Sequence, residues 1–545
     1  MRALLVQPAA PPTYWGYQHS LPFIAKGATL PPLGLATLAA LLPERWELRI
    51  RDLHLAPLDE TDLRWADAVL VTGMLVQAAS MHDTLRRARV LGKTTVVGGP
   101  AATSSPDAFP EATYCFRGEA EGRLELLVKA LEVPGEWPRD LAPAGEGHPD
   151  LALSPLPRFD LLPLDRYATF AIQVSRGCPF TCEFCDIIEL FGRVPRVKAP
   201  GQVLAELESL RRLGARGPLF VVDDNFIGNR RAAARLLPEI TAWQKAHGTP
   251  FDLLTEASLD LAGEDRLVAA MVEAGFSAVF VGLETPDPDT LARIGKKQNL
   301  KVDPATAIER LTRAGLEVFA GFIVGFDGDD AATLERQRVF VTGLPIPRAM
   351  VGLLTALPGT RLWRRLEREG RLRTEASCDQ YDRPNFETTL GDEALVAGYR
   401  ALLAALYAPE SYYARCARHL ELATHRAGPQ RPGSVATLLR VVWGIGVVGP
   451  RRRWFWPLMA VALRRGAAAI PRAIALAIVG EHLIEYTAAE VLPRLDRRLA
   501  EIRAERLAPR PAAEHRMRLP ARALAVAAAG EVVPRGVAAA SPVEG

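Results

Sequence analysis

The chain has 545 residues, of which 49% are hydrophobic and 24% are charged. This composition is that of a globular protein, and the length suggests about three domains. The net charge of +3 is too small to indicate nucleic acid as a partner. Six cysteines in a chain of this length do not form the dense disulfide framework of small secreted proteins. No signal-like segment opens the sequence and no run of about 18 uncharged apolar residues follows, so we expect a cytoplasmic protein without a spanning helix.

The first part of the chain alternates between short apolar runs and helical patterns. Five strands are predicted over residues 2–7, 46–52, 68–72, 94–97 and 114–117, with helices over residues 32–42 and 81–91. This alternation predicts an α/β domain over residues 1–135, with a doubly wound, Rossmann-like sheet. In such sheets ligands bind at the carboxyl ends of the strands.

Residues 136–164 are rich in Pro, Gly and acidic residues and are predicted to be a linker. A second alternating series covers residues 165–375. Its strands are predicted over residues 171–175, 219–223, 252–256, 278–283, 317–324 and 350–354. Six such units predict a partial (β/α)6 barrel, and a full barrel of eight units is the alternative.

The pattern becomes helical over residues 376–505, and the Ala-, Pro- and Arg-rich residues 506–545 are predicted to be a disordered tail. Between Glu421 and Glu481 there are nine arginines and no acidic residue. Three of these arginines, at 451–453, directly precede Trp454, Phe455 and Trp456. This composition is typical of a helix that lies on the inner face of a membrane. The alternative is a helical lid whose tryptophans pack on the barrel.

Three cysteines lie close together directly after the first strand of the second domain. They form the segment Cys178-Pro-Phe-Thr-Cys182-Glu-Phe-Cys185. Three thiolates on one tight loop can hold three irons of a 4Fe-4S cluster and leave the fourth iron open to a small-molecule ligand. Zinc would normally require a fourth ligand, and no second Cys/His pair lies at a suitable spacing.

This spacing, with Phe184 before the third cysteine, resembles the radical S-adenosylmethionine (SAM) superfamily. The resemblance implies that SAM binds the open iron and is cleaved to a 5′-deoxyadenosyl radical, with the electron supplied by an external donor such as flavodoxin or ferredoxin. It also implies a SAM site built at the ends of successive strands. The residues expected there are Phe184, Asp223, Glu256, Ser258, Gly282, Glu284 and Gly325.

The first domain resembles the cobalamin-binding domain found before many radical SAM modules. The residues that carry this likeness, at predicted strand ends, are Thr72, Gly73, Gly98, Gly99, Pro100, Gly118 and Glu119. Glycines at such positions let the backbone approach a flat macrocycle. His54 lies in a segment similar to a cobalt-ligating motif, but it follows the second strand rather than the first and Pro57 replaces a glycine. We therefore expect His54 to be a turn residue, and cobalamin to lack a strong histidine ligand.

The whole chain is similar to cobalamin-binding radical SAM proteins with a helical C-terminal domain, a group that includes hopanoid methylases. Residues 12–19 and 26–35 belong to that likeness. The resemblance implies a methyltransferase that uses methylcobalamin to methylate an unactivated carbon of a polycyclic, hopanoid-like lipid. Two alternatives remain open: a radical SAM enzyme that modifies a tetrapyrrole or another natural-product ring, and a non-catalytic cobalamin or redox sensor.

Overall fold

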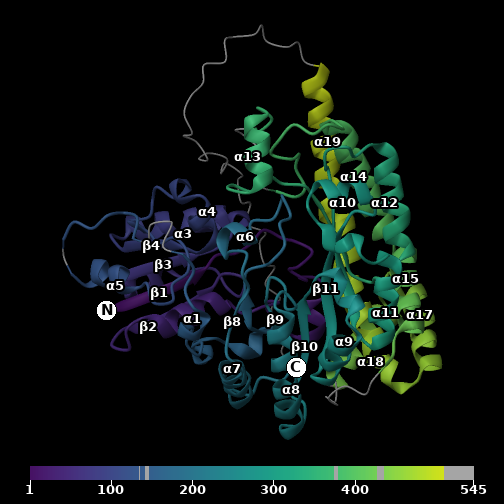
Figure 1. Cartoon of the computed structure of the whole chain (residues 1–545), viewed down its shortest axis with the longest axis horizontal. Helices are drawn as coiled ribbons and strands as arrows, with labels where there is room; N and C mark the ends of the chain where they lie inside the picture. The colour runs from purple at the N-terminus through teal and green to yellow at the C-terminus, as the bar shows by residue number, and fades with distance from the viewer. Residues whose placement is uncertain (134, 142–146, 374–378, 426–434, 508–545) are drawn as a thin grey trace, which may run out of the picture.

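The computed structural model describes residues 1–133, 135–141, 147–373, 379–425 and 435–507, whose arrangement is shown in Figure 1. The tail expected over residues 506–545 lies outside the described residues from residue 508 onward. Two sheets lie side by side, and the C-terminal helices lie on the side of the second sheet away from the first (Figure 1).

The first sheet confirms the doubly wound, Rossmann-like domain. Its five strands pair in parallel in the order β2-β1-β3-β4-β5. β1 and β3 are covered on both faces, which is why they form continuous apolar runs in the sequence. The strands are β1 (Arg2–Gln7), β2 (Glu47–Asp52), β3 (Ala68–Thr72), β4 (Thr94–Gly98) and β5 (Tyr114–Cys115), and the helices are α1 (Leu33–Leu41), α2 (Glu60–Trp65), α3 (Ala78–Val90), α4 (Gly99–Ser104) and α5 (Glu125–Glu132).

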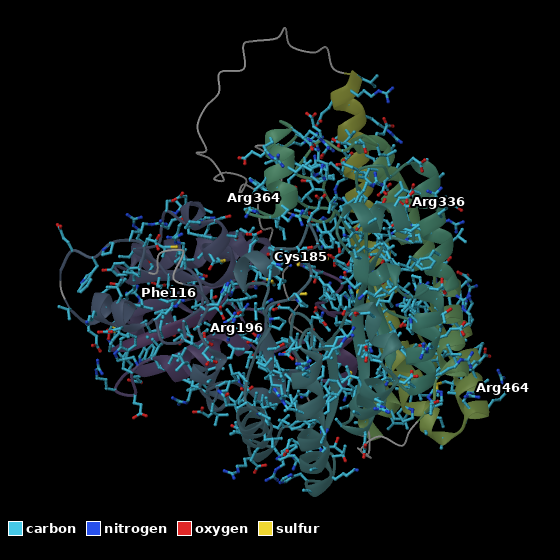
Figure 2. All side chains as sticks on the ribbon, viewed as in Figure 1. Phe116, Cys185, Arg196, Arg336, Arg364 and Arg464 are labelled. Atoms are coloured by element: carbon cyan, nitrogen blue, oxygen red, sulfur yellow. The ribbon has the colours of Figure 1, made fainter. Side chains whose placement is uncertain are left out.

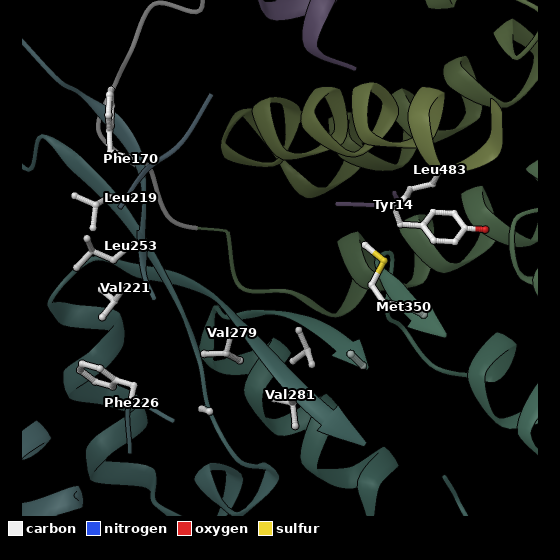
Figure 3. Packing of buried hydrophobic residues seen from close by; sticks show 14 of the residues in the cluster. Tyr14, Phe170, Leu219, Val221, Phe226, Leu253, Val279, Val281, Met350 and Leu483 are labelled. Atoms are coloured by element: carbon white, nitrogen blue, oxygen red, sulfur yellow. The ribbon is translucent and has the colours of Figure 1, made fainter. Parts of the chain in front are cut away.

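The second sheet confirms the partial (β/α)6 barrel. It has six parallel strands in the order β6-β9-β10-β11-β12-β13, and in the described residues β6 and β13 remain at its two edges. Val221, Leu253 and Val279 contribute to its buried core, as Figure 3 shows. The strands are β6 (Phe170–Ile172), β9 (Gly217–Val221), β10 (Phe251–Glu256), β11 (Phe276–Glu284), β12 (Glu317–Val324) and β13 (Ala349–Leu353).

Helices follow most strands of the second sheet, and aspartates begin several of them. The side chains of Asp287, Asp303 and Asp330 accept hydrogen bonds from backbone N–H groups in the first turns of α10, α11 and α12. The helices are α7 (Pro200–Arg212), α8 (Arg230–Ala246), α9 (Asp265–Glu273), α10 (Pro288–Arg293), α11 (Pro304–Ala314), α12 (Ala331–Gly343) and α13 (Arg361–Arg368). A short hairpin, β7 (Ser175–Arg176) with β8 (Arg196–Val197), and the short helix α6 (Ile187–Leu190) lie between β6 and α7.

The C-terminal helices cover the edge of the second sheet at β13. The hydroxyls of Tyr399 on α14 and of Tyr407, directly after this helix, donate hydrogen bonds to the backbone oxygens of Val351 and Ala349. These bonds satisfy carbonyl groups that an edge strand leaves unpaired. The helices here are α14 (Asp392–Leu406), α15 (Pro409–Leu422), α16 (Val435–Val441), the π-helical η9 (Val442–Val447), α17 (Arg452–Arg465), α18 (Ile470–Tyr486), η11 (Thr487–Val491) and α19 (Leu492–Leu507).

The segment that precedes the second sheet is packed rather than extended. Phe159, Leu162 and Leu164 are buried in a core that reaches from the first sheet to the C-terminal helices. The Gln202 side chain on α7 donates hydrogen bonds to the backbone oxygens of this segment, at 3.1 Å from Leu151. Its described residues form short 3-10 helices, at Leu151–Leu153, Phe159–Leu161 and Leu164–Arg166, and apolar residues spaced along it join the core.

Within the described residues, the helical stretch Ala467–Leu507 is long and apolar enough to cross a membrane by length and composition. However, 56% of its most apolar window is buried inside the protein. Because core helices of folded proteins have the same properties, this stretch is weak evidence for a membrane span.

Candidate active site

The three cysteines lie on the loop that follows the hairpin strand β7, and Figure 2 shows Cys185 between the first domain and the C-terminal helices. The loop is held from several sides by backbone hydrogen bonds, from Cys178 N to Gly192 O at 3.2 Å and from Glu183 N to Ile294 O at 2.9 Å. Gly177, with a φ of 93°, precedes the first cysteine. A Cβ atom there would lie 2.8 Å from Gly192 O, so the turn requires glycine.

The three thiols of this loop are partly or fully buried and lie close enough together to interact electrostatically. Burial raises the pKa of Cys178, Cys182 and Cys185, and nearby thiols raise it further for Cys178 and Cys185. Bound iron would relieve this cost because it holds the thiolate form. Among the described residues, no three His, Cys, Asp or Glu side chains are arranged to hold a single metal ion. The loop therefore fits a cluster, in which each cysteine binds a different iron, better than a zinc ion.

Lys296 stands next to this loop, and no sequence motif pointed to it. Its ammonium group pairs with the Glu284 carboxylate and lies 5.9 Å from the Phe184 ring centre. Burial disfavours the charge of Lys296, but Glu284 and then Cys182 outweigh it, so that its pKa is raised. The Lys296 cation in turn favours the thiolate of Cys182, which also lies 3.8 Å from Nε2 of Gln298. These two side chains give an anionic cluster a favourable environment.

The predicted SAM residues Asp223 and Glu256 meet at the carboxyl ends of β9 and β10. Asp223 is buried and accepts hydrogen bonds from Val174 N at 2.7 Å and the Ser175 hydroxyl at 2.6 Å, which fix the chain ahead of the cysteine loop. Glu256 is partly exposed; its backbone oxygen accepts a hydrogen bond from Phe226 N, but its side-chain carboxyl has no hydrogen-bond partner among the described residues. Burial, followed by the charges of Asp224 and Asp223, raises the pKa of Glu256 to about 8. Glu256 is therefore a carboxyl without a partner at this edge, and a cationic group such as the SAM amine would stabilise its ionised form.

The other predicted SAM residues lie on neighbouring elements. The Ser258 hydroxyl accepts a hydrogen bond from Asn225 at 3.3 Å. A Cβ atom on Gly282 would lie 2.4 Å from the Glu284 carboxylate, so this glycine makes room for the Glu284–Lys296 pair. Gly325 has a φ of 101°, and its N–H donates to Asp329 at 2.9 Å. Their contacts with SAM stay predictions.

The predicted cobalamin residues gather where β3 and β4 end. Gly99 has a φ of 83°, and a Cβ atom there would lie 2.1 Å from the Thr72 hydroxyl. The Gly73 carbonyl, after β3, accepts a hydrogen bond from Ala101 N in the first turn of α4. This bond ties the end of β3 to the segment that contains Gly98 and Pro100. α4 contacts α6, immediately after Cys185, so this edge adjoins the cysteine loop (Figure 1).

The surface beside this edge suits a macrocycle. The large apolar side chains of Met74 and Val76 directly follow β3 and are exposed. Exposed apolar residues gathered at the ligand-binding edge of a doubly wound sheet indicate a bound apolar group. The residues present therefore fit cobalamin, although their individual contacts stay predictions.

Gly118 and Glu119 follow β5. The Gly118 N–H donates to Thr103 on α4 at 2.9 Å. Both oxygens of Glu119 accept hydrogen bonds from arginines of the β7–β8 hairpin, at 2.8 Å from Arg176 and 2.8 Å from Arg196. Glu121, also buried, pairs with Arg176 as well. The sequence placed Glu119 at cobalamin, whereas the structure gives its carboxylate to a contact between the two domains.

Both nitrogens of the His54 ring have partners within the first domain, whereas the other histidine near the N-terminus, His19, has a buried Nε2 without a hydrogen-bond partner among the described residues. Nε2 of His54 accepts a hydrogen bond from Ala10 N at 3.0 Å, and Nδ1 lies 2.8 Å from the Asp52 carboxylate, as expected for a turn residue. The His19 ring stacks on His482 of α18 with centres 5.6 Å apart.

Comparisons with known proteins agree with this architecture. Residues 24–128 match the B12 binding domain, residues 172–336 the radical SAM superfamily, and residues 360–493 a domain of unknown function, DUF4070. An uncharacterised methyltransferase of Synechocystis sp. is 40% identical over 89% of this chain and 92% of its own length. The hopanoid C-2 methylase of Rhodopseudomonas palustris is 36% identical over 89% of this chain and 93% of its own length.

A solved structure has the same fold. TsrM, a radical SAM methyltransferase from Kitasatospora setae with cobalamin and a 4Fe-4S cluster bound, covers 87% of this chain with 98% of its own, at a TM-score of 0.57 and 17% identity. The relatives, rather than this distant likeness, show the family. The protein is an enzyme that uses a 4Fe-4S cluster, SAM and cobalamin to methylate carbon, which sets aside a non-catalytic sensor. The chain belongs to the cobalamin-binding radical SAM methyltransferases.

Proposed function

We propose that the protein methylates an unactivated carbon of a polycyclic, hopanoid-like lipid. The observation that carries this proposal is the 36% identity with a hopanoid C-2 methylase, which extends over 89% of the chain and so includes the C-terminal helices. When bound, the cluster and SAM supply the radical that removes substrate hydrogen, and cobalamin supplies the methyl group. The chain itself must bind and orient an apolar substrate and keep water from it.

Apolar side chains beside the cofactor residues support a lipid-like substrate. Trp15, from the connection after β1, is 47% exposed and packs edge-on against Phe280 of β11, with ring centres 5.5 Å apart. A Cβ atom on Gly321 of β12 would lie 2.8 Å from the Phe280 ring, so this glycine gives the ring its place. Side chains from the N-terminal connection and from the second sheet therefore meet in one apolar surface. Such a surface favours a hydrocarbon ring system over a charged substrate.

The reaction also needs a one-electron donor. We propose a soluble protein of the flavodoxin or ferredoxin class, because one electron must reach the cluster for each SAM that is cleaved. A protein with such a donor and reduced cysteines belongs in the cytoplasm.

A lipid comparison tests the substrate. The gene is expressed in a host that makes hopanoids but has no hopanoid methylase, and extracted lipids are compared by mass spectrometry with those from a host that carries the Cys182→Ala variant. We expect hopanoids with one added methyl group with the parent gene alone. Unchanged hopanoids, together with methylated tetrapyrroles or other ring compounds in extracts of the native host, would overturn the lipid proposal in favour of the ring-modifying alternative.

A further inference from the structure

A cluster of exposed apolar residues lies on the C-terminal helices, outside the residues expected to bind the cofactors. We call it the α16–α17 face; its large apolar members are Leu438, Leu439, Trp443, Val447, Val448, Trp456 and Leu463. These lie within 26 consecutive residues, yet they are seven of the twenty large apolar side chains exposed in the described chain. Such a concentration marks an interaction surface rather than scattered exposure.

Helix geometry puts these side chains on common faces. Leu439, Trp443 and Val447 follow one another at intervals of four residues, and the first two are 63% and 64% exposed. On α17, Trp456 and Leu463 are seven residues apart and share a face. The indole N–H of Trp456 donates to Gly446 O at 2.8 Å, so the two helices hold their exposed faces side by side.

The α16–α17 face is fixed to the body of the protein from behind. α16 packs on the short helix Leu21–Ile24, where Arg440 donates to Pro22 O at 3.3 Å. Ile445, Phe455 and Leu458 are buried in the main core. The apolar side chains are therefore presented by anchored helices and are not the result of a loosely packed end.

Charge distinguishes this face from an ordinary protein contact. Residues 422–480 contain no acidic residue. Arg452, Arg453 and Arg464 are exposed on α17, and Figure 2 shows Arg464 at the outer edge of the molecule. Of these, only Arg453 has an ion pair among the described residues, to Glu410 at 3.5 Å. Tryptophans next to unpaired arginines match the boundary between the acyl chains and anionic headgroups of a bilayer.

We propose that the α16–α17 face binds the surface of an anionic lipid bilayer, with its tryptophans and leucines at the level of the headgroup boundary and its arginines against lipid phosphates. A second copy of the chain is a poorer occupant, because a symmetric contact would bring the unpaired arginines of both copies together. The membrane contact uses no cofactor, and this proposal does not depend on which substrate the enzyme methylates.

Vesicle flotation with the full-length holoenzyme tests this proposal. Phosphatidylcholine vesicles with and without phosphatidylglycerol are compared at low and high salt. We expect the protein to float with the anionic vesicles at low salt, to remain behind with neutral ones, and to be released by salt. An Arg452→Gln/Arg464→Gln variant should need about thirtyfold more anionic lipid for half-maximal binding, and a Leu439→Ser/Trp443→Ser variant should also bind more weakly.

Matched substitutions on other exposed surfaces control for general effects. Arg231→Gln/Arg235→Gln on α8 and Val90→Ser/Val339→Ser should bind as the parent does. Circular dichroism and SAM cleavage in detergent-free buffer verify that each variant is folded and active. Failure of the parent to float with anionic vesicles at low salt overturns the proposal. So does a parent dimer, seen by sedimentation velocity, that dissociates in the Leu439→Ser/Trp443→Ser variant, since a second copy would then occupy the face.

Discussion

Cys182 shows how one side chain depends on its surroundings for its chemistry. Its thiol is buried, and Lys296 and Gln298 are the groups that favour its anionic form. We expect Cys182→Ala to reduce both cluster content and SAM cleavage to background, because two thiolates do not retain the cluster. Iron and sulfide analysis and chromatography of 5′-deoxyadenosine measure these outcomes.

The control for this prediction is Cys416→Ala, since Cys416 is buried within α15 of the C-terminal domain. Its loss should leave the cluster and SAM cleavage intact while lowering stability by about 1–2 kcal/mol, the cost of a small cavity. Undiminished SAM cleavage by the Cys182→Ala protein would contradict the assignment of the loop.

Glu256 should make the stability of the protein depend on pH. Its pKa is raised from 4.5 to about 8, first by burial and then by the charges of Asp224 and Asp223. The native protein therefore retains a proton that the unfolded chain releases, and stability falls as the pH rises from 4.5 towards 8. We expect Glu256→Gln to stabilise the cofactor-free protein by about 1–2 kcal/mol near pH 9, and much less near pH 5.

Thermal unfolding at both pH values measures this difference, with Glu239→Gln on the exposed side of α8 as the control. A gain in stability that is the same at both pH values would show that the effect of Glu256→Gln is not due to ionisation.

At the scale of elements, the turn between β4 and α4 decides how closely the first sheet can approach a ligand. Gly99 combines a φ of 83° with a neighbour, the Thr72 hydroxyl, only 2.1 Å from where a Cβ would be. Gly99→Ala must move either the turn or β3, at a cost of about 1–3 kcal/mol. We expect cobalamin binding to weaken at least tenfold, roughly 1.4 kcal/mol, while cluster content is unchanged.

Gly92→Ala is the matched control because Gly92 has a φ of 68° but no atom within 4 Å of the position of its Cβ. It shares the backbone strain without the contact, so its cobalamin affinity should equal that of the parent. Absorption titration with hydroxocobalamin measures both variants, and equal losses in the two would point to strain alone.

The β7–β8 hairpin and the segment after β5 are joined by buried charges. Glu119 pairs with Arg176 and Arg196, which lie on the two strands of the hairpin that precede and follow the cysteine loop. Glu119→Ala leaves two largely buried guanidinium groups without this partner, and we expect a loss of about 3–5 kcal/mol. Glu125→Ala removes an exposed pair with Lys129 and should cost less than about 1 kcal/mol.

Glu119→Ala should also loosen the contact between the cysteine loop and the cobalamin domain. Since the ion pairs fix the cysteine loop to the cobalamin domain, Glu119→Ala should lower the yield of methylated product for each 5′-deoxyadenosine formed. Chemical denaturation measures the loss of stability, and the ratio of methylated product to 5′-deoxyadenosine measures the effect on the reaction. An unchanged ratio would show that Glu119 contributes to stability alone.

At the scale of the whole molecule, the buried core continues from the first sheet through the packed segment before β6 to the C-terminal helices. Because Phe159 and Leu164 belong to that core, the bonds after Arg158 and Arg166 should resist trypsin in the native protein. Cleavage after Arg506, at the exposed end of α19, should be faster by more than tenfold, or about 1.4 kcal/mol in local opening. Mass spectrometry of a digestion time course decides, and early release of an intact first domain would show that the segment opens independently.

The sequence by itself determined the strands of both sheets and the cysteine loop. A strand covered on both faces needs a short apolar run that Gly, Pro or Asp ends, as in β3, and a cluster on one loop needs three thiols at a fixed local spacing. Both patterns involve residues that are neighbours in the sequence, so they can be recognised without knowledge of the tertiary structure. The same holds for the arginine- and tryptophan-rich composition of α17, whereas only the structure established that Arg452, Arg464 and Trp456 are exposed.

Only the tertiary structure decided what surrounds these residues. The charge of Lys296 favours the Cys182 thiolate, Glu119 pairs with Arg176 and Arg196, and the pKa of Glu256 is raised, because separate elements bring these groups together. Parallel strands align their carboxyl ends, and the loops that follow them meet at one edge of the sheet however distant they are in the chain. Charge pairing and burial across that edge depend on distances in space, which no spacing along the sequence fixes.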